Sequence, residues 1–261
     1  MRLNFIGEGP ALLIENEERL LVVADLHFGI EADLAAHGMH FRSHSKERLN
    51  RLLATVEKTC PDRLILLGDV KHSIPSLTRQ EWAEIPGILD KLRSRIPILV
   101  FPGNHDIGIE RFLSLGELQP KEGAVIDGVG YFHGHTYPAP ALGGHLIVTG
   151  HHHPQASLRD QVGCALQAPA FLRAGVDAVS LGLTVPDPAI PARALFVPAF
   201  NEIAGYDILR IVKDPFSPIS RCMNPDDAEV ILADGSYIGP LSLLLEDEEH
   251  DEPEGRKRRG A

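Results

Sequence analysis

The sequence predicts a protein of the α/β class, and two features of its pattern support this. Short runs rich in Val, Ile and Leu, bounded by Gly or Pro, are typical of buried strands. Segments with apolar residues at helical spacing lie between these runs. Strands that alternate with helices over about the first 110 residues indicate a layered sheet with helices packed on it.

Five apolar runs are each followed directly by a polar cluster. The runs are Leu20–Ala24, Arg63–Leu67, Ile98–Phe101, Val129–Phe132 and Leu146–Thr149. Buried strands that deliver polar groups at their ends build a site along one edge of a sheet. We therefore expect the five clusters to lie close together.

Three segments between the strands are predicted to be helical. Residues 45–59 place their Leu and Val side chains on one face, and residues 31–37 form a short helix that the following glycine ends. Thr78 followed by Glu81 is a capping-box pattern that begins a third helix. Pro86 should kink or restart that helix because proline lacks the backbone donor.

The sequence changes character after residue 153. Four prolines between 186 and 198 exclude a helix there. Apolar runs at 194–197 and 208–212 are predicted to be strands. Because these strands are expected to join the same fold, residues 1–245 should form a single domain.

Residues 246–261 form a charged C-terminal segment. Seven acidic residues are followed there by the run Arg-Lys-Arg-Arg. This composition predicts a disordered, solubilising end. Contact of the basic run with nucleic acid is the alternative.

Composition limits the classes of protein to consider. The chain has 261 residues, 44% of them hydrophobic, and a formal net charge of −11, which weakens any broad, charge-driven binding to nucleic acid. Its three cysteines have no CxxC spacing, so we expect neither a disulfide framework nor a thiolate metal site, and a reducing, cytoplasmic location fits. No signal peptide and no membrane span are expected, because the required apolar stretches do not occur.

The polar clusters contain residues that bind metals. They are Asp-Leu-His at 25–27, Gly-Asp at 68–69, Gly-Asn-His-Asp at 103–106, His-Gly-His at 133–135 and Gly-His-His-His at 150–153. Imidazole and carboxylate together suit Mn, Fe, Zn, Ni or Co. In an extended Asp-x-His segment both side chains project to the same side, so Asp25 and His27 could grip one ion. The glycines of the clusters allow sharp turns and close backbone approach.

Isolated histidines carry no such prediction. A lone His is more often an ordinary polar residue than a ligand. That interpretation applies to His37, His40, His44, His145 and His250.

The ordered set D-x-H, G-D, G-N-H-D, H and G-H-x-H resembles the calcineurin-like metallophosphoesterase superfamily, over residues 25–153. The resemblance implies two packed mixed β-sheets flanked by α-helices. Finer features, DLHFGIE at 25–31, GDVKH at 68–72 and PAFNE at 198–202, are similar to the archaeal phosphoesterases related to the SbcD-type repair exonuclease. A bacterial sister group associated with DNA ligase is the alternative branch.

The resemblance implies a dinuclear centre of two divalent ions, with Mn²⁺ first and Fe, Zn, Ni, Co or Mg as alternatives. The implied ligands are Asp25, His27 and His153 for one ion, Asn104, His133 and His151 for the other, and Asp69 as the bridge between them. His133 is preferred over His135 because the family's ligand directly follows the strand.

The resemblance also implies the chemistry. A hydroxide activated by both ions would attack phosphorus. His105 would act as general acid or charge stabiliser, with Asp106 orienting it. Lys71 and His72 are candidates for phosphate contact. His152 is expected to lie behind the ligands or in solvent.

The first function hypothesis is a phosphodiesterase or nuclease that acts on DNA, RNA or a nucleotide. The alternative is a small-molecule phosphatase or cyclic-nucleotide phosphodiesterase. A non-catalytic scaffold is the third hypothesis, and it is disfavoured because every motif position is filled. The oligomeric state is left open, a homodimer included. PAFNE is expected to be packing, with Asn201 the residue there that has a polar role.

Overall fold

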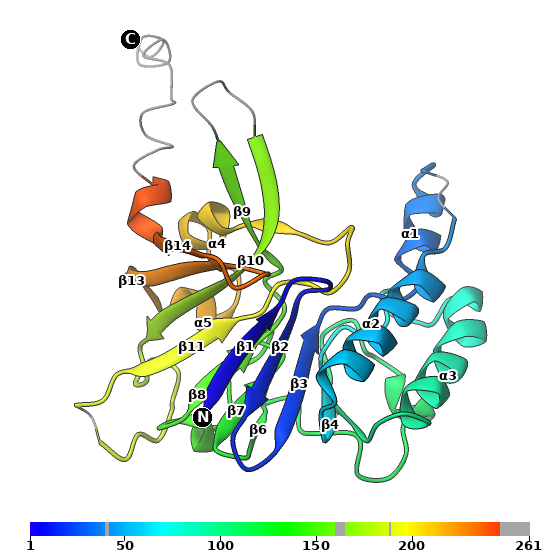
Figure 1. The fold of residues 1–261 in the computed structure, drawn as a ribbon, viewed down its shortest axis with the longest axis horizontal. Helices are drawn as coiled ribbons and strands as arrows, with labels where there is room; N and C mark the ends of the chain where they lie inside the picture. The colour runs from blue at the N-terminus through cyan, green and yellow to red at the C-terminus, as the bar shows by residue number, and fades with distance from the viewer. Residues whose placement is uncertain (40–41, 160–164, 188, 246–261) are drawn as a thin grey trace.

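The structure is a computed structural model that describes residues 1–39, 42–159, 165–187 and 189–245. The predicted tail at 246–261, together with His40 and His250, therefore lies outside the described residues. Two β-sheets pack face to face, and helices cover their outer faces (Figure 1). This confirms the α/β fold with two mixed sheets that the sequence predicts.

The first sheet has five strands in the order β1-β2-β3-β4-β5. They are β1 (Arg2–Ile6), β2 (Ala11–Glu15), β3 (Arg19–Ala24), β4 (Arg63–Leu67) and β5 (Ile98–Phe101). β1, β2 and β3 pair antiparallel, whereas β3, β4 and β5 are parallel neighbours. The carboxyl ends of the three parallel strands consequently meet at one edge.

The first half has three helices, α1 (Ile30–Ala36), α2 (Ser45–Thr59) and α3 (Arg79–Arg93). α2 and α3 cover one face of this sheet, whereas α1 stands beyond the ends of its strands (Figure 1). Figure 1 shows α2 and α3 side by side on the flank of the sheet. Both halves of the capping box at Thr78 and Glu81 are present, which confirms that prediction. The helix runs through Pro86 to Arg93, so the expected restart does not occur.

The second sheet has nine strands, with β12-β9-β10-β11-β8-β7-β6 in order and β13 and β14 branching from β10. They are β6 (Ala124–Ile126), β7 (Val129–Phe132), β8 (Leu146–Thr149), β9 (Pro154–Arg159), β10 (Ala165–Val176), β11 (Ala192–Phe196), β12 (Tyr206–Asp207), β13 (Met223–Leu232) and β14 (Tyr237–Pro240). β7, β8 and β11 are parallel. Their carboxyl ends lie at the same edge of this sheet.

One predicted strand is wrong. Residues 208–212 belong to the helix α4 (Ile208–Lys213), which Asp207 caps by accepting a hydrogen bond from the backbone N of Leu209 at 2.8 Å. A short run of Ile, Leu and Val fits either element, and here the cap decides for the helix. A second short helix, α5 (Pro218–Arg221), follows, and single 3₁₀ turns occupy Ile109–Phe112 and Pro140–Leu142.

The core has three layers, and strand β3 shows how the sequence builds them. Leu21 and Val23 face α2 and α3 in one apolar cluster. Leu20 and Val22 point the other way, into a cluster that the inner faces of both sheets share. This alternation is the period of two expected for a strand buried on both faces. A third cluster lies behind the second sheet and includes Ile208 of α4.

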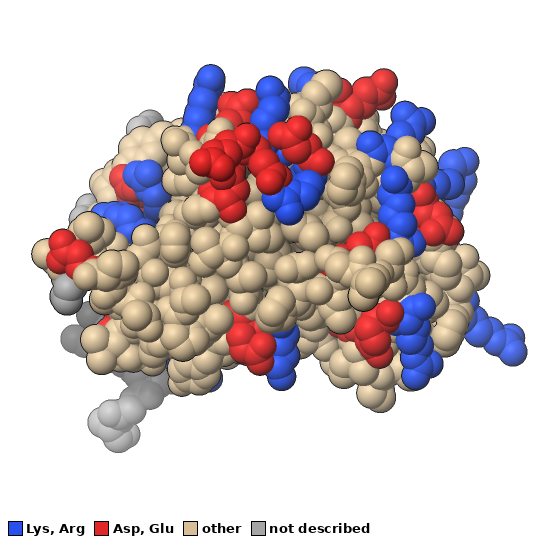
Figure 2. All heavy atoms as spheres, turned by 90° about the horizontal axis from the view of Figure 1, so that it is seen from below, with Lys and Arg blue, Asp and Glu red and all other residues tan. Residues whose placement is uncertain are grey.

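The surface carries charges of both signs. Figure 2 shows the molecule from below, with Lys and Arg beside Asp and Glu at the margins and a broad band of other side chains between them. Among the described residues, no helix has the length and apolar character needed to cross a bilayer.

Candidate metal centre

The polar clusters meet where the two sheets adjoin. They follow the carboxyl ends of β3, β4 and β5 in the first sheet and of β7 and β8 in the second. Backbone hydrogen bonds join the first two loops, from Asp25 N to Gly68 O at 3.1 Å and from His27 N to Asp69 O at 2.8 Å. The ends of five strands thus place the predicted site residues together.

A first group of side chains could hold a cation. Asp25, His27, Asp69 and His153 each offer a ligand atom, and these atoms lie within 4.8 Å of one another. Nε2 of His27 is 3.4 Å from Nε2 of His153. Nε2 of His153 is 3.1 Å from Oδ1 of Asp25.

A second group adjoins the first and shares one residue with it. Asp69, His133 and His151 also offer atoms within 4.8 Å of one another. Nε2 of His133 lies 3.6 Å from Oδ2 of Asp69 and 2.9 Å from Oδ1 of Asp25. Oδ1 of Asn104 is buried and has no hydrogen-bond partner among the described residues. Asp69 is therefore the carboxylate common to the two groups.

These residues fit divalent cations. Imidazole nitrogens that face one another and a buried amide oxygen without a partner are costly to desolvate unless a cation satisfies them. Carboxylate, imidazole and amide oxygen are donors that borderline divalent metals accept. The structure thus supports metal binding, and the number and identity of the ions belong to the proposal below.

The loops hold their side chains in an unusual backbone conformation. Five non-glycine residues here have positive φ: Asp25 at 56°, His27 at 45°, Asp69 at 49°, His151 at 70° and His153 at 46°. The expected extended Asp-x-His geometry is therefore wrong, and left-handed turns bring the side chains together instead. Asp and His tolerate this region better than most residues, at a cost of about 1–3 kcal/mol each.

Two glycines allow the close approach of the loops. A Cβ on Gly103 would lie 2.0 Å from Oδ1 of Asp69. A Cβ on Gly68, which has a φ of 77°, would lie 2.2 Å from Cδ2 of His133. Larger residues would displace candidate ligands, in agreement with the role predicted for these glycines.

The segment after β11 supports the first loop. Phe200 N donates to Ala24 O at 2.8 Å. The buried amide of Asn201 donates to Leu26 O at 3.1 Å and His27 O at 3.5 Å. This polar role of Asn201 agrees with the sequence prediction, although the sequence did not identify its partners.

His105 faces the two groups, but its orienting partner differs from the prediction. The Nδ1 of His105 bonds to the carbonyl of His72, and its Nε2 lies 4.0 Å from Oδ2 of Asp69. Asp106 accepts from the backbone N of Gly103 at 2.8 Å and of Lys71 at 3.2 Å. Asp106 therefore shapes the loop, and the ring of His105 is held by the carbonyl of His72.

Lys71 is directed away from solvent, whereas the side chain of His72 is partly exposed. Lys71 is fully buried, and its Nζ donates to the carbonyls of His105 and Ser73. The ring of His72 stacks on that of His105, with centroids 5.2 Å apart. The structure does not support Lys71 as a phosphate contact, because its ammonium donates to backbone carbonyls, and phosphate contact by His72 stays a prediction.

Two buried residues near the cluster were not identified as site residues. Glu81 caps α3 and also accepts from the backbone N of His72 at 3.0 Å and of Ser73 at 2.7 Å. Ser217 Oγ lies 2.7 Å from Nε2 of the buried His152, which stands behind the ligands as expected. Their capping patterns were the only sequence signal, and such patterns do not reveal tertiary partners.

The isolated histidines lie apart from the candidate metal ligands. Among the described residues, the groups of possible ligands do not include His37, His44 or His145. His145, for example, bonds through Nδ1 to Gly128 O at 3.0 Å. They act as ordinary polar residues.

Burial and charge act against each other on the titratable groups. Burial favours the neutral form of Asp25, but His153 and His133 outweigh it and hold the pKa of this carboxyl well below its ordinary value. Burial alone would lower the pKa of His133, and the carboxylates of Asp69 and Asp25 instead raise it to about 9. Burial and the charge of Asp69 raise the pKa of Asp106 to about 6. Asp25 is therefore ionised at neutral pH, as a metal ligand must be.

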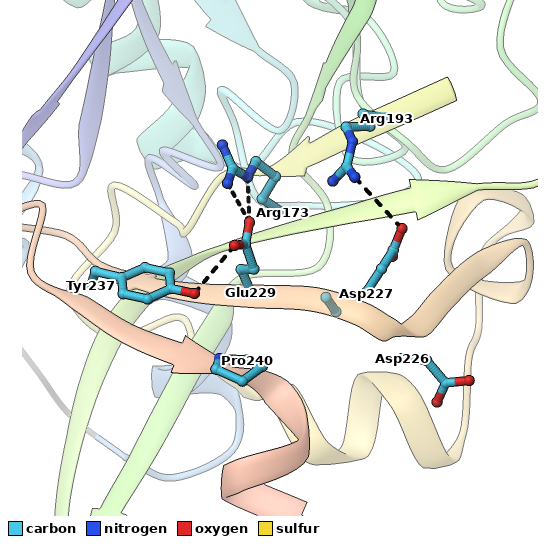
Figure 3. A pocket seen from close by; sticks show the side chains of 8 residues that line it. Arg173, Arg193, Asp226, Asp227, Glu229, Tyr237 and Pro240 are labelled. Atoms are coloured by element: carbon cyan, nitrogen blue, oxygen red, sulfur yellow. Dashed lines mark hydrogen bonds and ion pairs between the residues drawn. The ribbon is translucent and has the colours of Figure 1, made fainter. Parts of the chain in front are cut away.

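A separate cavity lies on the second sheet. It has a volume of about 500 Å³ and is lined by residues of β10, β11, β13 and β14. Figure 3 shows its arginines pointing at carboxylates: Arg173 pairs with Glu229, and Arg193 lies 3.9 Å from Asp227. Because these cations already have partners, the cavity is a weaker candidate for phosphate binding than the Asp/His cluster.

A cluster of Asp and His at the strand ends of a two-sheet α/β fold is typical of metal-dependent phosphoester hydrolases. The model of the calcineurin-like phosphoesterase family matches residues 18–179, so the chain belongs to that family and hydrolyses phosphate ester bonds. The resemblance found in the sequence is thereby confirmed for the family.

The fold is also similar to solved structures. The crystal structure of Pseudomonas putida nuclease MPE matches with a TM-score of 0.56 and 20% identity, covering 91% of this chain and 100% of that one. At this identity the likeness establishes the fold alone. Yfce, a phosphoesterase from E. coli, matches at 18% identity over 54% of this chain and 73% of its own, with a TM-score of 0.36, too low to carry an argument.

Proposed function

We propose that the chain is a phosphodiesterase with nuclease activity and a dinuclear metal centre. The observation that carries the proposal is that Asp69 belongs to both groups of candidate ligands. A carboxylate shared in this way is what a bridging ligand between two ions requires. A protein of similar fold is described as a nuclease, which agrees with this substrate class, although the likeness at 20% identity establishes the fold alone.

The proposed ligands are Asp25, His27 and His153 for one ion, Asn104, His133 and His151 for the other, and Asp69 for both. Bound divalent ions supply Lewis acidity, which lowers the pKa of water and neutralises charge on the phosphate. The buried loops keep the ligand side chains in place and exclude bulk water, which strengthens each electrostatic contact.

His105 is the proposed general acid. Its Nδ1 is committed to the carbonyl of His72, so Nε2 is the atom turned toward the cluster. In the protonated ring, Nε2–H can donate to the leaving oxygen or to a phosphate oxygen. Asp106 supports this role indirectly, because it holds the loop that carries His105.

The charge around the site favours diesters over monoesters. A monoester dianion needs more positive charge than a diester monoanion, and Lys71, the lysine beside Asp69 in the chain, directs its ammonium at backbone carbonyls. The net charge of −11 argues against an extended basic surface, so contacts with nucleic acid would be local.

Finer assignments belong to the same proposal. DLHFGIE, GDVKH and PAFNE support the archaeal SbcD-related branch, with the ligase-associated bacterial group as the alternative. Mn²⁺ is the proposed metal because mixed carboxylate, amide and imidazole donors suit it. A cytoplasmic location rests on the scattered cysteines.

A substrate panel tests the proposal. Turnover of bis-nitrophenyl phosphate, mono-nitrophenyl phosphate, cyclic nucleotides and single-stranded DNA is compared with Mn²⁺, Mg²⁺, Zn²⁺ and Ni²⁺, with Asp69→Asn protein as the blank. We expect Mn²⁺-dependent cleavage of the diester and of DNA to exceed that of the monoester. Faster monoester turnover would favour the phosphatase alternative, and turnover insensitive to chelators would contradict the metal centre.

A further inference from the structure

Two histidines of the proposed centre each have a second histidine at the far side of the ring. His27 turns Nε2 toward the first group, and its Nδ1 lies 3.2 Å from Nδ1 of His72. His133 turns Nε2 toward Asp25 and Asp69, and its Nδ1 lies 3.1 Å from Nδ1 of His135. The same arrangement thus occurs on both sides of the cluster.

The chemistry of imidazole determines the direction of these hydrogen bonds. A neutral ring carries one proton, and a nitrogen that binds a metal must offer its lone pair. With Nε2 of His27 and His133 facing the centre, their Nδ1 atoms carry the protons and donate. The Nδ1 atoms of His72 and His135 must then accept, so both rings carry their own proton on Nε2.

Other contacts hold His72 in this orientation. Its Nε2 is 3.7 Å from Oδ2 of Asp33 on α1, which is too long for a hydrogen bond but places a carboxylate on the side of the ring where that proton lies. Its ring stacks on His105, and its backbone N donates to Glu81 at 3.0 Å. His72 therefore lies between His27 and the exposed carboxylate of Asp33 on α1.

A third ion is the competing explanation for this cluster. His27, His72 and His105 also offer atoms within 4.8 Å of one another. However, His105 already commits Nδ1 to the carbonyl of His72. Nε2 of His27 belongs to the first group, so a third ion would need both nitrogens of that ring. A hydrogen bond between His27 and His72 leaves the bond of His105 to the carbonyl of His72 intact and uses only Nδ1 of His27.

We propose that His72 and His135 are positioning residues, each of which accepts the Nδ1 proton of a metal-binding histidine and so fixes its orientation and tautomer. The inference rests on the metal centre proposed above. Histidine ligands commonly donate this proton to a carboxylate, a carbonyl or water, and loss of the partner typically weakens metal affinity about 10–100-fold. A neutral imidazole acceptor keeps the ligand oriented without adding negative charge.

Paired substitutions test this role. His72→Leu and His135→Leu remove the acceptor at similar volume, whereas His72→Asn and His135→Asn place an amide oxygen close to the position of Nδ1. His145→Leu, away from the cluster, is the matched control. Calorimetric titration with Mn²⁺ should give about 10–100-fold weaker binding in the Leu variants, recovery of most of that loss in the Asn variants, and no change in the control.

Kinetics at saturating Mn²⁺ separate positioning from substrate contact. We expect the Leu variants to keep the KM of wild type for bis-nitrophenyl phosphate. A raised KM with unchanged Mn²⁺ affinity would overturn the inference and make His72 a substrate contact. Three ions per wild-type chain would favour the third site, and wild type that binds no Mn²⁺ would overturn the metal centre itself.

A measurement on wild-type protein covers the case in which a variant does not fold. In the ¹⁵N spectrum of Zn²⁺-loaded protein, we expect His72 and His135 to show an unprotonated Nδ1. We expect His27 and His133 to show a protonated Nδ1. A protonated Nδ1 on His72 and His135 would overturn the proposal.

Discussion

Asp69 is the residue on which both groups of candidate ligands depend. It is almost fully buried, and its Oδ1 accepts from the backbone N of His105 at 2.8 Å. Its Oδ2 lies 3.8 Å from Nε2 of His27 and 3.6 Å from Nε2 of His133. One oxygen thus holds the loop while the other faces imidazoles on both sides.

Asp69→Asn should therefore remove metal binding at both positions. The amide keeps the volume of the carboxylate but loses the negative charge that a bridging ligand supplies. We expect no turnover and loss of both ions, measured by metal analysis after dialysis. Asp90→Asn, an exposed change on α3, is the control. Retention of two ions by the Asp69→Asn protein would contradict the bridging role.

His105→Ala should separate binding from chemistry. The ring is not among the proposed ligands, so Mn²⁺ affinity should stay near that of wild type. Loss of a positioned acid costs about 10²–10⁴-fold in rate when the leaving group is poor. We expect a large loss on single-stranded DNA and a small one on bis-nitrophenyl phosphate, whose leaving group needs little protonation. Equal losses on both substrates would contradict the assigned role.

At the scale of elements, the PAFN segment fixes the loop that follows β3. Asn201 lies 175 positions from one of its partners, and its amide bridges the carbonyls of Leu26 and His27. The side-chain oxygen accepts from Ile203 N at 2.8 Å. The left-handed turn at His27 is therefore stabilised by hydrogen bonds from Asn201, a residue that is distant in the sequence.

Asn201→Asp should loosen that turn. A carboxylate of the same shape cannot donate to two carbonyls, and a buried group left unsatisfied costs about 1–3 kcal/mol. We expect that loss in the free energy of unfolding, measured by urea denaturation, together with weaker Mn²⁺ binding. Asn224→Asp, at the exposed start of β13, is the control. An unchanged Mn²⁺ affinity would show that Asn201 serves packing alone.

Local patterns predicted the strands that precede the polar clusters and the helices between them, because each of these elements had one dominant signal. Strands β4, β5, β7 and β8 begin and end at the predicted residues, since turn residues bound apolar runs there. The prediction of a strand at residues 208–212 was wrong. The apolar run there is short, and the helix cap at Asp207 outweighs the strand preference of its β-branched residues. Strand order and the branching of β13 from β10 depend on contacts between distant segments, which periodicity does not encode.

The sequence predicted which residues form the candidate site better than it predicted how they are arranged. Residues such as Asp25 and His151 could be selected because each follows a buried strand, and the structure brings them together. The positive φ values, the burial of Lys71 and the partners of Asp106 were not predicted. Those features come from loops that contact one another across the sheet edge, so sequence neighbours do not reveal them.

At the scale of the whole molecule, we propose that residues 1–245 form a single domain. The support is one apolar cluster that contains Leu20 and Val22 of the first sheet together with Val148 and Leu195 of the second. Neither sheet would keep its inner face from water alone, so the two halves are expected to fold together.

Ion pairs connect the helices over the first sheet with the segment between β11 and β12 of the second sheet. Arg48 of α2 is fully buried and pairs with Glu202 at 2.9 Å and Glu31 at 3.3 Å. Burial disfavours the ionised form of Glu202, but hydrogen bonds from Arg48 and Arg51 outweigh it and lower its pKa to about 2. The ionised form is therefore favoured by folding.

Glu202→Gln should consequently lower stability in a pH-dependent way. The depressed pKa contributes stability that is present above the ordinary value of about 4.5 and is lost as the pH falls toward about 2. We expect the difference in unfolding free energy between wild type and variant to be largest near neutral pH and to shrink between pH 4.5 and pH 2. Urea denaturation across this range measures it, and a constant difference would contradict the linkage.

The candidate ligands come from loops of both sheets, with Asp25 and Asp69 on one and His133 and His151 on the other. A cation bound among them would link the two sheets. Because the ligands come together only in the folded chain, the free energy of cation binding would add to the free energy of unfolding. At a concentration of 100 times Kd, a single ion would add about 2.7 kcal/mol to the stability of the chain. The melting temperature of the protein should then report the free manganese concentration around it.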